Sequence, residues 1–205
     1  FRKHLLAARH GVNFEGALTW AFEFEDQPYF AGFRALASNG LDLPVLNVFR
    51  LFSRMGPERL AAESSAEVPL DAILKSGVRG APDVAALASR DGRRLAVLVW
   101  HYHDDDVVGP DAAVELAISG WEPAAAGTAV LTHYRIDGEH SNSYAAWRKL
   151  GSPLAPNDKQ YAALEQAGKL AALGNPERIP VEPGNVTLRF ALPRQGVSLL
   201  VLDPP

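Results

Sequence analysis

The sequence predicts an α/β segment over residues 1–56, followed over residues 57–205 by an antiparallel β-sandwich with a helical insertion at about 141–173. Two observations predict this division. Before Gly56, one nearly continuous apolar stretch lies between two helical patterns, whereas after it short apolar runs alternate with glycine and proline. A parallel strand covered on both faces is apolar throughout. Short strands separated by turns that contain glycine and proline are typical of antiparallel sandwiches.

The first segment is expected to contain a helix, a strand, a loop and a second helix. Residues 1–10 carry Leu5 and Leu6 and precede Gly11, which fits the position just after a helix. Residues 17–24 are apolar and aromatic, as a buried parallel strand requires. Such a unit cannot close a core alone, so we expect it to be the end of a larger α/β domain.

The second helix of this segment is predicted to begin at Pro44, because proline suits the first helical turn. Gly56 and the proline after it end the pattern. Four apolar side chains mark one face at helical spacing: Val45, Val48, Phe49 and Phe52.

The second segment is expected to be a set of short antiparallel strands. The run Arg90-Asp91-Gly92-Arg93 predicts a hairpin turn, because the strand candidates 84–88 and 95–102 flank it. Helical spacings predict the insertion at 143–150 and 158–173, with Asn157 or Asp158 as the cap of the second helix. The remaining strand candidates are 113–118, 129–136, 186–192 and 197–202.

Composition excludes several classes of protein. The 205 residues include 47% hydrophobic residues and no cysteine, so a core is expected and disulfides are excluded. A net charge of −4 and a pI near 5.9 argue against a nucleic-acid or anionic-membrane partner. We expect a soluble bacterial protein, cytoplasmic or periplasmic. The start of the chain resembles the middle of a helix, so we expect the chain to be part of a longer protein.

Three side chains near the end of the predicted strand are candidates for sugar binding: Trp20, Glu23 and Glu25. The carboxyl ends of barrel strands carry active sites. There a tryptophan can stack on a sugar ring, and a carboxylate can accept hydrogen bonds from its hydroxyls. The alternative is a core tryptophan with two surface glutamates. We reject Glu23 and Glu25 as a catalytic pair, since both would approach the sugar from one direction.

Two polar strings have structural alternatives. Residues 101–106 (His-Tyr-His-Asp-Asp-Asp) could offer metal ligands, although a strand ending in an acidic turn is the simpler interpretation. Residues 133–144 contain Ser, His and Asp, but no Gly-x-Ser-x-Gly run presents a nucleophile. The simpler interpretation is a strand end, a turn and a helix start. No phosphate-binding loop or zinc spacing occurs, so we expect no cofactor and no metal.

Residues 16–33, Gly-Ala-Leu-Thr-Trp-Ala-Phe-Glu-Phe-Glu-Asp-Gln-Pro-Tyr-Phe-Ala-Gly-Phe, and residues 43–56 resemble the end of the barrel in glycoside hydrolase family 39, the β-xylosidases and their relatives. Residues 133–137 and 140–147 resemble the accessory domain of bacterial members. The resemblance implies the C-terminal piece of a (β/α)₈ TIM barrel, followed by a β-sandwich. It also implies exo-acting, retaining hydrolysis of β-1,4-xylosidic bonds at non-reducing ends.

The resemblance implies an acid/base glutamate in an Asn-Glu-Pro setting after the fourth strand, and a nucleophile at the seventh. Asn-Glu-Pro does not occur here, so both catalytic residues are expected upstream of this chain, which alone should be inactive. Trp20 matches the tryptophan that walls the sugar subsite. Glu25 matches a sugar-binding glutamate, but the run Trp-Ala-Phe-Glu-Phe departs from the commoner Trp-Thr-Phe-Ser-Asp, so Glu23 is an alternative.

The expected partners are a xylo-oligosaccharide or aryl xyloside and the upstream part of the same barrel, and homo-oligomerisation stays open. A different class of function is a non-catalytic carbohydrate-binding sandwich that uses Trp100, Trp121 or Trp147. Such a module needs aromatic side chains on one exposed face, whereas Trp100 lies in an apolar run that indicates core. A calcium-stabilised adhesion sandwich would depend on Asp104–Asp106 alone.

Overall fold

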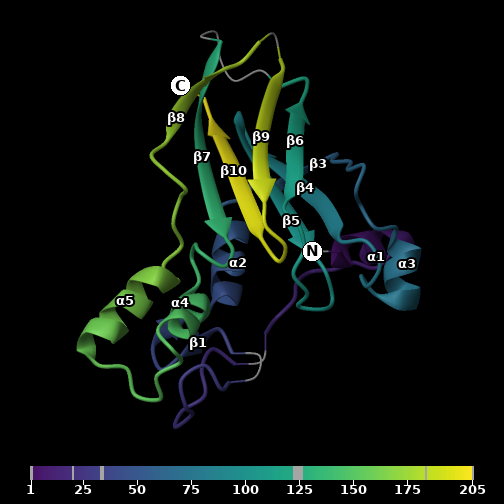
Figure 1. The fold of residues 1–205 in the computed structure, drawn as a ribbon. Helices are drawn as coiled ribbons and strands as arrows, with labels where there is room; N and C mark the ends of the chain where they lie inside the picture. The colour runs from purple at the N-terminus through teal and green to yellow at the C-terminus, as the bar shows by residue number, and fades with distance from the viewer. Residues whose placement is uncertain (1, 20, 33–34, 122–126, 183, 205) are drawn as a thin grey trace.

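The computed structural model describes residues 2–19, 21–32, 35–121, 127–182 and 184–204, and its fold is mostly β with short helices (Figure 1). Two antiparallel sheets form its centre. The large sheet has the order β3-β4-β5-β10-β7-β8, and the small sheet pairs β6 with β9. The strands are β3 Glu58–Leu60, β4 Asp83–Asp91, β5 Arg94–Tyr102, β6 Ala112–Ile118, β7 Thr128–Ile136, β8 Glu177–Pro180, β9 Val186–Leu192 and β10 Val197–Asp203.

The strands after Gly56 confirm the predicted antiparallel pattern. In the β4–β5 hairpin Asp91 lies opposite Arg94, so Gly92 and Arg93 form the two-residue turn. Gly92 has φ 57°, the left-handed conformation that such a turn requires. Strands β6, β7, β9 and β10 each begin within one residue of the predicted positions.

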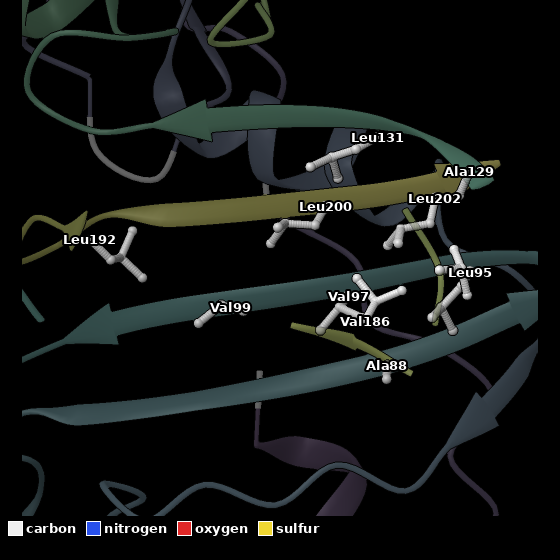
Figure 2. Packing of buried hydrophobic residues seen from close by; sticks show 11 residues of the cluster. Ala88, Leu95, Val97, Val99, Ala129, Leu131, Val186, Leu192, Leu200 and Leu202 are labelled. Atoms are coloured by element: carbon white, nitrogen blue, oxygen red, sulfur yellow. The ribbon is translucent and has the colours of Figure 1, made fainter. Parts of the chain in front are cut away.

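One hydrophobic core lies between the two sheets. Alternate residues of β5 point to opposite faces, so Leu95, Val97 and Val99 face the small sheet (Figure 2). The small sheet contributes Val186 and Leu192 to the same cluster. Each fully buried aliphatic side chain of this kind stabilises the fold by about 1.5–3 kcal/mol. The packed pair of sheets is therefore the stable body to which the other elements attach.

Helix α2, Pro44–Phe52, covers the opposite face of the large sheet. It begins at Pro44 as predicted, and only part of the apolar face marked by helical spacing packs against the sheet. Leu51 is fully buried against the sheet, whereas Val45, Phe49 and Phe52 are about 40% exposed. The helix has two apolar stripes, and periodicity alone cannot tell which one meets the sheet.

Helices α1 (Lys3–His10) and α3 (Leu70–Ser76) lie together beside the β4–β5 side of the large sheet (Figure 1). Gly11 ends α1 with φ 61°, as predicted. The anchor is Asp83, which is 1% exposed and accepts hydrogen bonds from Arg2 and from the Trp100 indole. The Arg2 guanidinium also lies over the Trp100 ring, 5.6 Å from its centroid. A buried, fully bonded carboxylate thus fixes the start of α1.

The predicted strand at residues 17–24 is absent from its described residues, 17–19 and 21–24, which form no regular element. Leu18 is fully exposed, and Phe22 and Phe24 are 59% and 38% exposed. A parallel strand needs neighbouring strands for its hydrogen bonds, and no strand of the described residues pairs with this segment. These residues are largely apolar, but no described residue of the segment belongs to the buried core.

Two helices lie between β7 and β8 at one end of the sheets: α4, Ser143–Lys149, and α5, Asp158–Gly168 (Figure 1). Asn157 caps α5 as expected and forms a capping box with Gln160. The helix ends five residues before the predicted end at Leu173. Beyond it the chain follows β7, where Ala172 bridges to Tyr134.

Candidate functional site

The candidate site is built on a small hairpin below the sheets. Strands β1, Ala37–Ser38, and β2, Leu41–Asp42, pair antiparallel around a two-residue turn. Asn39 has φ 50° and Gly40 has φ 78°. Positive φ at both central residues is the requirement of a type I′ turn, which Asn-Gly favours most. The dipeptide Asn39-Gly40 is thus a strong local signal for a hairpin that was not among the predicted elements.

The loop that follows Trp20 is bound to this hairpin by its backbone. The Phe22 carbonyl accepts hydrogen bonds from the amides of Leu36 and Ala37, at 2.8 and 2.9 Å. Farther along, the Phe30 amide donates to the Ser38 hydroxyl at 2.6 Å. Three hydrogen bonds, at Phe22 and Phe30, therefore hold the loop at 21–32 against the hairpin and Leu36.

Glu23 is the one predicted site residue whose carboxylate is held. Its Oε1 accepts a hydrogen bond from the Gly40 amide at 2.8 Å, and the side chain is half-buried. Glu25 is exposed. Trp20 lies outside the described residues. The structure therefore separates the two glutamates: one is fixed on the hairpin and the other extends into solvent.

Helices α4 and α5 contact the same hairpin from the other side. The Tyr161 hydroxyl donates to the Asn39 carbonyl at 3.0 Å, and the Ser143 hydroxyl donates to the Asp42 carbonyl. Gly168 also approaches closely, because a Cβ there would lie 2.9 Å from the Asp42 oxygen. Residues more than 100 positions apart in the sequence thus meet at this turn.

Three aromatic rings pack where the loop meets α4. The Phe30 ring centroid lies 5.0 Å from that of Trp147 and 5.7 Å from that of Tyr144. The Trp147 indole donates to the Pro153 carbonyl at 2.9 Å. The Trp147 side chain therefore packs and hydrogen-bonds inside the protein, and its contact with Phe30 holds the loop against α4.

Burial raises the pKa of the Tyr161 hydroxyl, and the charges of Tyr29, Glu165 and Glu23 act in the same direction. A phenol is protonated at neutral pH even without such a shift, so the Tyr161 hydroxyl can donate its hydrogen bond to the Asn39 carbonyl there.

A second polar cluster lies at the end of the inner face of the large sheet. Ser198 is fully buried, and its Oγ lies 2.9 Å from His133 Nε2 and 2.8 Å from Arg135 Nε. Burial lowers the pKa of His133 to about 4, and the positive charge of Arg135 adds to the effect. Because the Ser198 hydroxyl has no exposed surface, this Ser–His pair is a structural hydrogen bond and not a nucleophile.

The turn after β7 is held by Asp137, which is 6% exposed. Its Oδ1 accepts hydrogen bonds from the amides of Glu139 and His140, both at 2.8 Å. Although burial opposes ionisation, these amides and the His140 ring lower the pKa of Asp137. Asn142 then caps α4 by accepting from the Ala145 amide. The interpretation of residues 133–144 as a strand end, a turn and a helix start is confirmed.

The string at residues 101–106 also has a structural role. His101 and His103 are 2% and 5% exposed, and the His101 Nδ1 lies 2.8 Å from the Leu192 carbonyl. Asp104 accepts a hydrogen bond from the Val78 amide. Within the described residues, no group of three or more His, Cys, Asp or Glu side chains is arranged to hold a metal ion. Nor does any described helix have the length and apolar character needed to cross a membrane.

Several solved structures have a fold similar to that of this chain. Among solved structures, the chain is similar to a family 39 enzyme from Xanthomonas axonopodis pv. citri (TM-score 0.52, 22% identity, 62% of this chain and 28% of that one). It is similar to a monomeric β-xylosidase from Caulobacter crescentus CB15 (TM-score 0.67, 18% identity, 90% and 37%). It is also similar to a bacterial orthologue of human α-L-iduronidase (TM-score 0.65, 20% identity, 80% and 28%).

The chain thus spans between 28% and 37% of the length of these structures, and at such identities the likeness shows the fold. No curated protein matches the chain. A model of the glycosyl hydrolases of family 39 matches residues 12–178. Because this match covers most of the sequence, the chain belongs to glycosyl hydrolase family 39.

Proposed function

We propose that this chain is the C-terminal part of an exo-acting, retaining β-xylosidase. It supplies sugar contacts from Trp20 and Glu23, while the acid/base and nucleophile glutamates lie upstream. The observation that carries the hydrolase assignment is the family match over residues 12–178. The β-xylosidase assignment is supported by the resemblance of residues 16–33 and by the Caulobacter crescentus β-xylosidase, which has a similar fold.

Exposed apolar surface supports an upstream barrel. Phe14 and Leu18 are 47% and 102% exposed, and Phe49 of α2 is 43% exposed. Phe14 and Phe49 line an apolar groove of about 530 Å³, which also reaches Leu87 of β4. Neighbouring barrel strands and helices would cover this surface, and residues 17–24 would then gain the strand partners that a parallel sheet supplies.

Between the two glutamates, the geometry favours Glu23. Its Oε1 is held by the Gly40 amide, so Oε2 is left to accept a hydrogen bond from a sugar hydroxyl. A binding side chain fixed by a second hydrogen bond loses less conformational freedom when the ligand arrives. Glu25 has no such support and is exposed.

The structure gives no support to a carbohydrate-binding module built on the other tryptophans. Trp100 is 2% exposed and donates its indole N–H to Asp83. Trp121 packs against the core between the sheets and donates to the Arg93 carbonyl. Trp147 packs against Phe30. These rings lie in three separate places and not on one exposed face.

The test compares the chain alone with the same chain extended by its own upstream residues. The purified chain should show no turnover of an aryl β-xyloside, and the extended protein should hydrolyse it with retention of configuration. An aryl α-L-iduronide is the second substrate, because one structure of similar fold is an α-L-iduronidase orthologue. Turnover by the chain alone, with contaminating xylosidase excluded by an inactive mock preparation, would contradict the proposal.

A further inference from the structure

We propose that Tyr161 is a positioning residue for Glu23, and that the β1–β2 hairpin transmits its effect. In this scheme α5 holds the Asn39–Gly40 turn, and the turn fixes the glutamate carboxylate. The inference rests on the proposed function only in assigning sugar binding to Glu23. It assigns a role to two residues, Tyr161 and Gly40, that lie far from Glu23 in the sequence.

The first step is the contact between the turn and the carboxylate. The Gly40 amide donates to Glu23 Oε1 at 2.8 Å. A backbone amide that donates to an ionised carboxylate makes a charge-assisted hydrogen bond, which is roughly twice as strong as a neutral one. The direction of the Gly40 N–H therefore determines where the carboxylate lies.

The second step is the contact that fixes this amide. Asn39 and Gly40 both have positive φ, so the peptide between them has a defined orientation. The Tyr161 hydroxyl binds the Asn39 carbonyl, which belongs to that same peptide unit, at 3.0 Å. The phenol is also in close contact with Gly40, since a Cβ there would lie 2.8 Å from the Tyr161 oxygen. Rotation of this peptide would break both the Tyr161 and the Glu23 hydrogen bonds.

The third step is the rigidity of α5. Its first turn is closed by the Asn157–Gln160 capping box, and Leu164 is fully buried. Its last residue, Gly168, offers its carbonyl to the buried Asn47 side chain at 2.7 Å. Tyr161 therefore extends from a helix that is fixed at both ends, as a positioning group requires.

The first experiment observes the Gly40 amide by NMR in the ¹⁵N-labelled 205-residue chain during an acid titration. In the unsubstituted protein the Gly40 signal should move during the titration, because its amide donates to the Glu23 carboxylate, and Glu23→Gln should abolish this movement. Tyr161→Phe removes only a hydroxyl and should reduce the movement at least about two-fold, since the turn is no longer held. Tyr134→Phe on β7 is the matched control and should leave the signal unchanged.

The second experiment measures KM and kcat for an aryl β-xyloside in the protein extended by its upstream residues. Tyr161→Phe should raise KM about five-fold, the effect of one hydrogen bond, with kcat nearly unchanged. Tyr134→Phe should change neither constant.

The two measurements separate the two hypotheses. If the Gly40 amide signal moves with pH as much in Tyr161→Phe as in the unsubstituted chain, the positioning role is overturned. A smaller movement of the Gly40 signal in Tyr161→Phe would support the positioning role. If the extended protein is also inactive on the aryl β-xyloside, the proposed xylosidase activity is contradicted while the positioning role stands. Equal KM values in the active extended protein and its Tyr161→Phe variant would overturn the role of Tyr161 in substrate binding.

Discussion

The partly buried His133 predicts a loss of stability in mildly acidic solution. Its Nε2 lies 2.9 Å from the buried Ser198 hydroxyl, its ring contacts Phe190 at 5.0 Å, and Arg135 lies beside it on β7. Burial and the Arg135 charge lower its pKa in the folded protein to about 4, against about 6.5 in an unfolded chain. The folded state therefore keeps this imidazole neutral where the unfolded state already binds a proton.

The sign and size of the effect follow from proton linkage. The stabilisation by neutral His133 is fully present above about pH 6.5 and is lost as the pH falls toward 4. Between pH 7 and pH 5 the free energy of unfolding should fall by about 2 kcal/mol from this group alone. Urea unfolding followed by tryptophan fluorescence measures the free energy at each pH.

The His133→Gln variant isolates the contribution, and His140→Gln is the matched control, because the His140 ring is about 43% exposed. His133→Gln should reduce the difference between pH 7 and pH 5 by about 2 kcal/mol, whereas His140→Gln should keep most of it. If unsubstituted protein and His133→Gln lose the same free energy between these two pH values, the burial argument is wrong.

Two further substitutions test buried polar groups by urea unfolding. Asp83→Asn should lower the free energy of unfolding by about 2 kcal/mol, because Arg2 and the Trp100 indole lose a charged hydrogen-bond acceptor and Arg2 keeps only Glu67 as an ionic partner. Asp71→Asn in an exposed ion pair should cost less than about 1 kcal/mol. Asn47→Ala should cost about 2–3 kcal/mol, because two buried carbonyl groups lose their donor, while Asn13→Ala on the surface should change stability by less than about 0.5 kcal/mol. If a buried substitution and its exposed control lower the free energy of unfolding equally, the role assigned to that buried side chain is wrong.

Local patterns predicted the sheet strands well. Strand β5 alternates between two cores, and the hairpin at Gly92 follows from a glycine in the left-handed conformation. The cap at Asn157 and the start of α2 at Pro44 are also local signals, each set by residues within one turn. These elements depend on near neighbours in the sequence, so the sequence alone carries the information.

Other features depend on contacts between distant residues. The pair Arg2 and Asp83 is separated by 81 positions, and Tyr161 and Asn39 by 122. No local spacing predicts such a contact. The missing strand at 17–24 has the same cause, since an apolar run shows that a surface needs covering but not which segment covers it. The fully buried Asn47 was missed because a polar residue on a helix is normally exposed.

The most direct test of the central claim is kcat/KM for an aryl β-xyloside in the protein extended by its upstream residues, compared between Glu23→Gln and Glu25→Gln. The fixed carboxylate of Glu23 predicts a loss of about 10- to 100-fold for Glu23→Gln, as expected when a hydrogen bond to a charged group is lost. Glu25→Gln should lose less than about five-fold. A larger loss for Glu25→Gln than for Glu23→Gln would contradict the assignment of Glu23 as the sugar-binding glutamate.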